Sequence, residues 1–285
     1  MSLLEAQTDF GLNLLRANSY AASQSTIISL ISISIALAMC YAGAKNQTAN
    51  QISQAIAGDA ISDDTQMILT NAIYFKGTWE YKFEKNQTAP KTFYLSENRE
   101  QQVPMMKIIK PFPYYEDNQV QVLGLPYKSQ EVFLYVILPK DRFGLSNLLQ
   151  DITGQKLQNH IQEAHKWHND NSYTQTYVEL PRFKIEAGLS LNDALKKLGI
   201  TDAFDERSDF SGMTDSRDLY ISDVVHKAFI ETNEEGSEAA AATGVIMRVT
   251  SVEQFRTFHA DHPFLYAIAT RQGDILFTGT VASFE

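Results

Sequence analysis

The hydrophobic residues near the start of the chain recur at the spacing of α-helices. A helix over residues 3–17 would place its apolar side chains near one face: Leu3, Leu4, Phe10, Leu14 and Leu15. Residues 27–42 contain no charged side chain, which predicts a core helix that is hydrophobic on most faces. Gly43 would end that helix, and Thr48 is predicted to cap a third helix that stops at Gly58.

From residue 65 onward, β-branched and aromatic residues alternate with turn signals, a pattern typical of strands. The predicted strands cover residues 66–74, 93 onward, 120–125, 132–138, 177–185, 219–222, 228–232, 264–270 and 275–281. Helical spacing returns at residues 145–151, 155–164 and 189–198. Because helices come first and strands dominate later, we predict an α+β fold of mainly antiparallel sheets. No internal repeat divides the chain, so a single domain over residues 1–285 is expected.

The charge balance excludes one class of partner. The formal net charge is -10 at pH 7. Phosphate binding needs clustered Lys and Arg, and the only adjacent basic pair, Lys196 and Lys197, falls on a predicted helix. We therefore expect neither nucleic acid nor an anionic membrane as a partner.

No targeting or membrane-spanning segment is evident in the sequence. The uncharged stretch 27–42 falls short of the roughly 20 residues that cross a bilayer. No basic segment leads into it, as a secretory signal would require, and the acidic residues Glu5 and Asp9 precede it. These features predict a cytoplasmic protein, with the extracellular space as the alternative. The two Asn-Gln-Thr sequons, at Asn46 and Asn86, would matter only in that alternative.

The motifs of common enzyme classes are missing. The sequence contains no G-x-S-x-G, P-loop, G-x-G-x-x-G or H-E-x-x-H, so nothing predicts an active site or a cofactor. The best metal candidate is the group His160, His165 and His168, but His160 is off-phase on a helix, which disfavours a zinc site. Cys40 is the only cysteine, which excludes an intrachain disulfide and suits a reducing compartment. Because its neighbours are apolar, we predict a buried small hydrophobe there.

One segment toward the C-terminal end has an unusual composition. Residues 234–260 read EEGSEAAAATGVIMRVTSVEQFRTFHA, with a glutamate pair followed by four consecutive alanines. Helix propensity predicts a helix capped by Ser237, since alanine is the best helix former. The flanking runs 228–232 and 245–252 are strand-like, and this mixture favours a loop that adopts more than one conformation. Both interpretations fit the local sequence.

Motifs along nearly the whole chain resemble the serpin family and follow the family's order. They are NAIYFKGTWE at 71–80, FYLSENREQQVPMMK at 93–107, LPYK at 125–128, LPK at 138–140, LPRFKIEAGLSLNDALKKLGITDAF at 180–204, DFSGM at 209–213, DVVHKAFIETNEEG at 223–236, and DHPFLYAI with GDILFTGTV between 261 and 281. The segment EEGSEAAAATG resembles the hinge of an inhibitory serpin's reactive-centre loop. The chain is similar to members of the family that lack a signal peptide.

The resemblance implies a protease inhibitor that acts as a suicide substrate and is not an enzyme. A serine protease, or a cysteine protease, would attack the reactive-centre loop at about 234–258 and form an acyl-enzyme. The cut loop would then insert as an extra strand into the central sheet and distort the trapped protease. The implied hinge consists of Glu234, Glu235, Gly236, Ser237, Glu238, Ala239, Ala240, Ala241 and Ala242. Small side chains there would lower the steric cost of entering a packed sheet.

The family's usual loop spacing, counted from Glu234, implies a scissile bond between Thr250 and Ser251. The bond between Arg248 and Val249 is the alternative, because it would suit a trypsin-like protease with an acidic specificity pocket. The resemblance further implies a monomer that needs no cofactor or metal.

Two departures from the family's pattern point to a second interpretation. Leu30 stands where the family usually has a proline. At residues 57–65 the chain passes almost directly into the strand that leads to NAIYFKG. Serpins normally have there a helix that often binds cofactors, the outer strands of the central sheet and a helix across its face. Losing that first helix would remove the usual heparin-binding surface. The alternative is therefore a non-inhibitory serpin-like protein, cleaved as a plain substrate or serving as a binding or storage protein.

Overall fold

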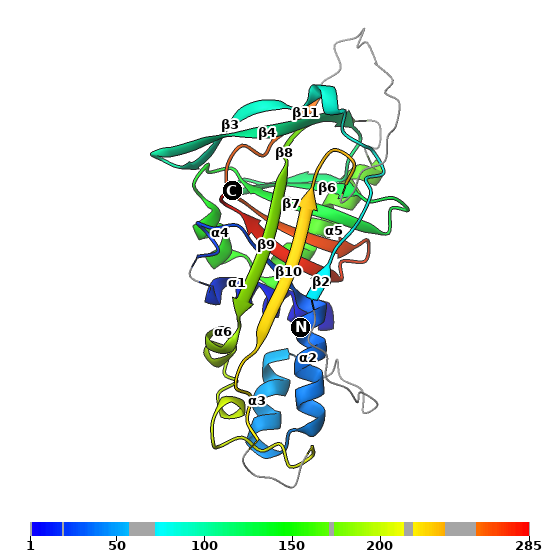
Figure 1. Ribbon diagram of the computed structural model, residues 1–285. Helices are drawn as coiled ribbons and strands as arrows, with labels where there is room; N and C mark the ends of the chain where they lie inside the picture. The colour runs from blue at the N-terminus through cyan, green and yellow to red at the C-terminus, as the bar shows by residue number, and fades with distance from the viewer. Residues whose placement is uncertain are drawn as a thin grey trace.

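The computed structural model describes residues 2–18, 20–56, 72–170, 174–213, 219–236 and 255–284, and the account below is confined to these residues. The described helices are α1 (Leu3–Ala17), α2 (Leu30–Gly43), α3 (Asn46–Ile56), α4 (Leu145–Asp151), α5 (Gly154–Asp170) and α6 (Asn192–Lys197). Short 3-10 turns lie at Lys85–Gln87 and Asp202–Phe204. The molecule is elongated, with α2 and α3 at one end (Figure 1). In the part of the chain described here, no helix is both long and apolar enough to cross a membrane.

The largest sheet lies in the middle of the molecule. Its strand order is β1 (Thr26–Ser29), β13 (Ile275–Val281), β12 (Phe264–Thr270), β7 (Val132–Pro139), β6 (Val120–Pro126) and β5 (Tyr114–Glu116). Every neighbouring pair in it is antiparallel.

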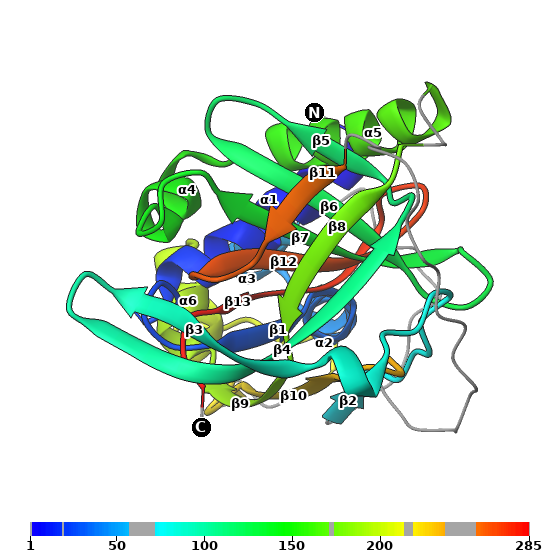
Figure 2. The same cartoon turned by 90° about the horizontal axis from the view of Figure 1, so that it is seen from above.

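Two smaller sheets pack around the large one (Figure 2). The first has the order β2 (Ala72–Tyr74), β10 (Val225–Thr232) and β9 (Phe183–Ser190). The second has the order β11 (Arg256–His259), β8 (Thr176–Pro181), β4 (Arg99–Lys110) and β3 (Ala89–Ser96) and lies at the end opposite α3 (Figure 1).

The core divides into two clusters on either side of the six-stranded sheet, and the alternation along β7 shows why. Phe133, Tyr135 and Ile137 belong to the cluster that includes α1 and α5, whereas Leu134 and Val136 belong to the cluster that includes the two smaller sheets. Since successive side chains of a strand point to opposite faces, both faces of this sheet are buried. The prediction of an α+β fold with mainly antiparallel sheets is confirmed.

Several predicted boundaries need correction. The apolar run 27–42 is not one helix, because Thr26–Ser29 form β1 and pair with β13 at the edge of the large sheet. The helix begins at Leu30, and the Ser29 hydroxyl accepts a hydrogen bond from the Ser32 N–H. Leu30 is thus the first helical residue, a position at which a backbone N–H has no partner within the helix and proline is tolerated.

Thr48 does not cap the third helix, which already begins at Asn46. The buried Thr48 hydroxyl instead accepts a hydrogen bond from the Asp209 N–H at 2.9 Å. It therefore joins α3 to the loop after α6. Residues 219–222 are not a strand, and the side chains of Leu219 and Tyr220 are exposed.

The predicted strand 177–185 is two strands that belong to different sheets. β8 ends at Pro181, and the Arg182 N–H bonds to the Pro104 carbonyl before β9 begins at Phe183. The predicted helix 189–198 starts late for a related reason, since Leu189 and Ser190 still pair with β10. Helix α5 continues to Asp170, beyond the predicted end at residue 164. Residues 57–71 lie outside the described part of the chain, so the predicted strand from residue 66 is described only at β2.

Candidate functional site

The segment singled out by sequence follows directly from β10, which lies in the middle of the three-stranded sheet. β10 pairs antiparallel with β9 along its whole length but pairs with β2 in parallel over three residues: Lys227 with Ala72, Ala228 with Ile73 and Phe229 with Tyr74. Parallel pairing is slightly less stable per residue than antiparallel pairing. Among the described residues, this parallel contact between β2 and β10, here called the seam, is therefore the weaker of the sheet's two strand pairings.

The chain turns sharply at the end of β10. Asn233 and Gly236 exchange backbone hydrogen bonds at 3.1 and 3.2 Å. Gly236 has φ +108°, and a Cβ on it would lie 2.2 Å from the Gly77 carbonyl oxygen. Only glycine fits this backbone conformation and this close approach. The start of the loop is thus locked onto residues 77–79.

Two buried glutamates hold the same turn. Glu234 accepts hydrogen bonds from the Thr88 hydroxyl at 2.6 Å and from the Arg182 guanidinium. Burial alone would raise the pKa of Glu234, but these two donors outweigh it and the pKa lies below the ordinary value. The Glu235 carboxylate pairs with the Lys85 ammonium at 2.6 Å. Both carboxylates therefore favour the closed turn while they are ionised.

Trp79 braces the turn from the side of the large sheet. Its indole N–H donates to the Asn233 carbonyl at 2.8 Å, and its ring stacks on Tyr127 at a centroid distance of 4.5 Å. The backbone N–H groups of Trp79 and Phe83 donate to the carbonyls of Glu235 and Glu234. The stacked Trp79 and Tyr127 rings and these backbone hydrogen bonds thus hold the turn that follows β10.

A third buried glutamate holds the other end of the segment. β11 pairs in parallel with β8, and His259 Nδ1 lies 3.0 Å from a carboxylate oxygen of Glu179. The Lys91 ammonium and the Tyr177 hydroxyl also donate to Glu179, at 2.5 and 2.6 Å. Burial opposes ionisation of Glu179, yet these donors lower its pKa to about 2. The carboxylate is therefore ionised at neutral pH and ties β11 to β8 and β3.

Arg256, at the start of β11, adds a second anchor. Its guanidinium lies over the rings of Tyr114 and Trp167, at 5.4 and 5.8 Å from their centroids. Such cation–π contacts join β11 to β5 and to helix α5. The Glu234–Gly236 turn and the start of β11, which precede and follow residues 237–254 in the sequence, are therefore each held by a buried glutamate and its partners.

The structure places only part of the predicted site. Glu234, Glu235 and Gly236 lie at the turn described above. The remaining hinge residues, Ser237, Glu238, Ala239, Ala240, Ala241 and Ala242, and the candidate bonds at Thr250–Ser251 and Arg248–Val249 lie outside the described residues. Sequence reasoning did not single out Thr88, Arg182 or Glu179, because each reaches its partner only through the tertiary fold.

Two of the three histidines of the predicted helix contact different residues. His160 Nε2 lies 3.4 Å from the Asp117 carboxylate, whereas His165 Nε2 lies 2.6 Å from the Tyr135 hydroxyl. Burial lowers the pKa of His165 to about 4. No group of three potential metal ligands occurs within the described ranges. These side chains serve the packing of α5 on the large sheet.

A family model described as "Serpin (serine protease inhibitor)" matches residues 5–60 and 51–284, which together span most of the chain. This chain belongs to the serpin family. The human leukocyte elastase inhibitor is 39% identical over 249 residues, which are 84% of this serpin and 64% of that relative. Human Serpin B3 is 39% identical over 247 residues, 84% of this serpin and 61% of the relative. This serpin thus spans less than two thirds of the length of these relatives.

Solved structures agree on the fold. The thermophilic serpin tengpin in its native state superposes with a TM-score of 0.84 at 24% identity, covering 99% of this serpin and 94% of that chain. Uncleaved ovalbumin superposes with a TM-score of 0.81 at 23% identity, covering 99% of this serpin and 100% of that chain.

Proposed function

We propose that this serpin inhibits a serine protease, or a cysteine protease, as a suicide substrate, with residues 234–258 as bait. The observation that carries the proposal is the position of the hinge. β10 runs straight into the Glu234–Gly236 turn and, among the described residues, lies beside β2 in a parallel pair of three residues. A cut loop that folded back at this turn would arrive at the seam.

Insertion at this seam has a physical driving force. A new strand between β2 and β10 would form ladder hydrogen bonds on both sides, each contributing roughly 0.5–1.5 kcal/mol net. The alanines Ala239–Ala242 would enter a packed sheet at low steric cost. The intact protein would then be stable for kinetic reasons, because the turn and its glutamate contacts keep the loop outside.

The bait bond is proposed at Thr250–Ser251, with Arg248–Val249 as the alternative. Cleavage releases a C-terminal fragment whose mass identifies its first residue. A fragment that begins at Ser251 supports the first bond and one that begins at Val249 supports the second. Any other start rejects both assignments.

Incubation with a panel of serine and cysteine proteases tests the inhibitory function. We expect a covalent complex with at least one protease that survives denaturing electrophoresis. Cleavage by every protease without such a complex would reject the proposal.

Ala240→Arg, with Ala240→Ser as the matched control, tests the inserted hinge in the same assay. The arginine would bury a charge in the sheet at a cost of several kcal/mol. We expect cleavage of both variants but trapping only by Ala240→Ser. Equal trapping by both would show that the loop does not insert.

A non-inhibitory serpin-like protein, cleaved as a substrate or acting as a binding protein, is the second candidate. The observation that favours it is that β2 forms an edge of the three-stranded sheet in the described part of the chain. Among the described strands nothing pairs with the outer side of β2. A sheet that narrow would hold an inserted strand less firmly. A monomeric state, a cytoplasmic location, and the absence of nucleic acid, membrane and heparin partners stay predictions.

A further inference from the structure

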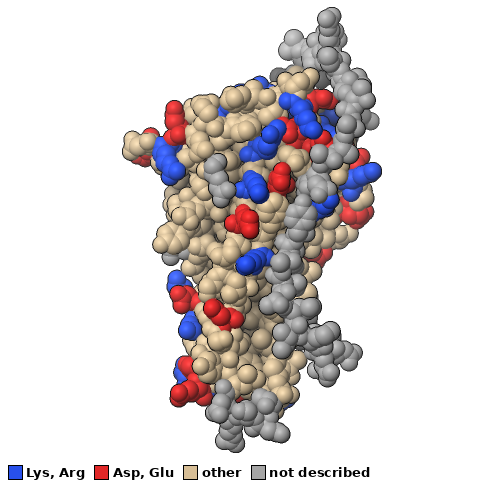
Figure 3. All heavy atoms as spheres, viewed as in Figure 1, with Lys and Arg blue, Asp and Glu red and all other residues tan. Residues whose placement is uncertain are grey.

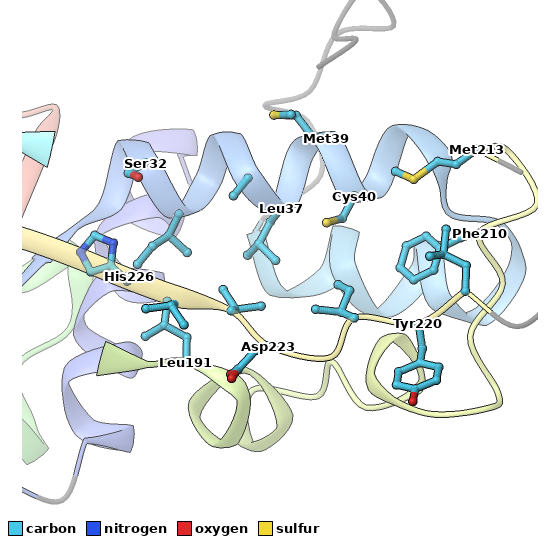
Figure 4. Close-up of a pocket in the computed structure, with 16 residues that line it drawn as sticks. Ser32, Leu37, Met39, Cys40, Leu191, Phe210, Met213, Tyr220, Asp223 and His226 are labelled. Atoms are coloured by element: carbon cyan, nitrogen blue, oxygen red, sulfur yellow. The ribbon is translucent and has the colours of Figure 1, made fainter. Parts of the chain in front are cut away.

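Two prominent surface features of the molecule do not select a partner. The cavity of about 300 Å³ between α2 and the start of β10 has mostly apolar walls, and nothing among the described residues specifies what fills it (Figure 4). On the face drawn in Figure 3, basic and acidic side chains lie intermixed, so the described residues form no extended patch of one sign there. His160, a buried residue of α5, differs from both because the groups around it are defined.

One ring nitrogen of His160 is buried without a hydrogen-bond partner. The residue is 5% exposed, and the unpartnered nitrogen is Nδ1. The other nitrogen, Nε2, lies 3.4 Å from the Asp117 carboxylate. That carboxylate is held in place by the backbone N–H groups of Gln119 and Val120, which donate to its Oδ1 at 2.7 and 2.9 Å. A neutral ring with its proton on Nε2 therefore directs an N–H toward Asp117 and leaves a lone pair on Nδ1.

The groups that surround the ring favour its neutral form. Asp117, in the turn after β5, attracts the protonated ring, whereas Lys156, one turn earlier on α5, repels it. Glu163, one turn later on the same helix, pairs instead with Lys166. Burial is the largest influence, and the pKa of His160 lies below the ordinary value. A second ring proton would also place a donor on Nδ1, where the described residues offer no acceptor.

The other elements that pack on α5 direct their described charges elsewhere. β5 presents the Tyr115 ring to His160, while its Glu116 carboxylate pairs with the Lys140 ammonium. β6 contributes apolar side chains to the cluster beneath α5. In α1, the Asp9 carboxylate accepts a hydrogen bond from the Gly154 N–H at the first residue of α5. Asp117 is therefore the acid that a charged His160 would face.

A chain of ring contacts joins His160 to the start of β11. The His160 ring stacks on Tyr115 at a centroid distance of 5.3 Å. Trp167, two turns further along α5, meets Tyr115 in a T-shaped contact at 5.5 Å. The Arg256 guanidinium lies 5.8 Å from the Trp167 centroid, and α5, β5 and β11 lie side by side (Figure 2). The position of the His160 ring thus bears on the anchor of β11 through three contacts.

We propose that His160 is a pH-responsive latch on the start of β11, closed while the ring is neutral and opened when the protonated ring leaves its stack on Tyr115. The direction follows from the site, because a ring in water binds the extra proton more tightly than the buried ring does. The latch is therefore closed above about pH 6.5, the ordinary value for histidine, and opens as the pH falls below it. Opening removes the support of Tyr115 and Trp167 and loosens Arg256.

The two tryptophans of the chain, Trp79 and Trp167, report on the latch when they carry fluorine at ring position 5. The ¹⁹F signal of Trp167 should move between pH 8 and pH 5 with the same midpoint as the His160 ring, followed by proton NMR. In His160→Gln this movement should vanish, since glutamine stays neutral, whereas His168→Gln, the matched control on the same helix, should keep it. A Trp167 signal that stays constant, or that moves equally in His160→Gln, would overturn the proposal.

Amide hydrogen exchange measures the effect on β11. The Arg256 N–H donates to the Gln175 carbonyl at 3.1 Å, and the Ala260 N–H donates to the Glu179 carbonyl at 2.9 Å. After correction for the intrinsic pH dependence of exchange, the protection of both amides should fall by up to about tenfold per pH unit below pH 6.5, the limit for one proton. The amides of β12 in the large sheet should keep their protection. Equal protection of the β11 amides at pH 7.5 and pH 5.5 would contradict the latch.

Tyr115→Leu, with Tyr115→Phe as the matched control, tests the chain of rings. Leucine removes the ring between His160 and Trp167, whereas phenylalanine retains it. In Tyr115→Leu the His160 ring should still titrate, but the Trp167 signal and the protection of β11 should no longer follow the pH. Both should follow it in Tyr115→Phe. The measurements need no protease, so they do not depend on the proposed inhibition. Unchanged pH dependence in Tyr115→Leu would show that these rings do not connect His160 to β11.

Discussion

The six-stranded sheet and the three-stranded sheet of this serpin differ in how their strands pair and in how deeply their residues are buried. In the large sheet, β12 pairs antiparallel with β7 and β13, and its residues from Phe264 to Ala269 are 0% exposed. In the small sheet, the described part of β2 pairs with β10 in parallel over three residues. Val225, the first residue of β10, is 57% exposed. The large sheet is buried on both faces, whereas β10 of the small sheet alternates between buried and more exposed residues.

This difference suggests that the six-stranded sheet resists local opening more strongly than the three-stranded sheet does. Elements with few buried apolar contacts open locally at a small fraction of the global unfolding free energy. The small sheet carries the Glu234–Gly236 turn, so the proposed insertion would open the sheet where its described strand pairing is weaker. The large sheet meanwhile holds the second anchor through β5, whose Tyr114 ring lies under the Arg256 guanidinium.

The largest expected effect comes from the large sheet. Leu134→Ala removes a side chain that is 0% exposed in the middle of β7, and it should lower the free energy of unfolding by about 2–5 kcal/mol. Val225→Ala in the small sheet should change it by less than about 0.5 kcal/mol, because that side chain is mostly in solvent. Urea denaturation of both variants measures this contrast. If both variants lost a similar amount of unfolding free energy, the proposed difference in burial between the two sheets would be contradicted.

A smaller effect is expected at the turn that closes the small sheet. In Gly236→Ala the new Cβ would meet the Gly77 carbonyl at a positive φ, a strain of about 1–3 kcal/mol. Gly188→Ala on β9 is the matched control, since a Cβ there meets nothing within 4 Å. We expect faster amide hydrogen exchange at Trp79 and Phe83 in Gly236→Ala alone. Unchanged exchange rates would mean that the Glu234–Gly236 turn does not affect local opening of the three-stranded sheet.

The third effect concerns the anchor of β11 and depends on pH. Glu179 has a folded-state pKa of about 2, whereas an unfolded glutamate has about 4.3. Its ionised contacts therefore stabilise the fold above about pH 4.3, and this contribution is lost as the pH falls toward 2. Glu179→Gln should lower the melting temperature at pH 7 and less so at pH 3.

Glu186→Gln, an exposed position on β9, serves as the control and should have little effect at either pH. A Glu179→Gln variant whose deficit is the same at pH 3 and pH 7 would show that the charge of Glu179 does not hold β11.

The sequence predicted the elements of the large sheet well and those of the small sheets less well. The runs 120–125, 132–138, 264–270 and 275–281 are apolar and bounded by turns, and each matches a strand of the large sheet to within a residue or two. Residues 177–185 were misread because the alternation continues through Pro181 and Arg182, although the chain changes sheets there. Only the tertiary pairing separates β8 from β9.

The anchors could not have been found from local patterns. Thr88 and Glu234 are 146 positions apart in the sequence, and Lys91 and Glu179 are 88 positions apart. Glu234 stood out because of the alanines that follow it, whereas Glu179 lies in a strand pattern that gives no hint of burial.

The comparison of melting curves for intact and loop-cleaved protein tests the central claim most directly. The chain is cut between residues 237 and 254, and the fragments should stay associated because β12 and β13 pair with β7 and β1. The intact and cleaved forms are heated at equal concentration. If the small sheet accepts the cut loop between β2 and β10, the cleaved protein gains a strand and melts well above the intact protein. Nicking an ordinary surface loop has the reverse effect. A cleaved form that melts at or below the intact form would show that this serpin carries the bait without the trap.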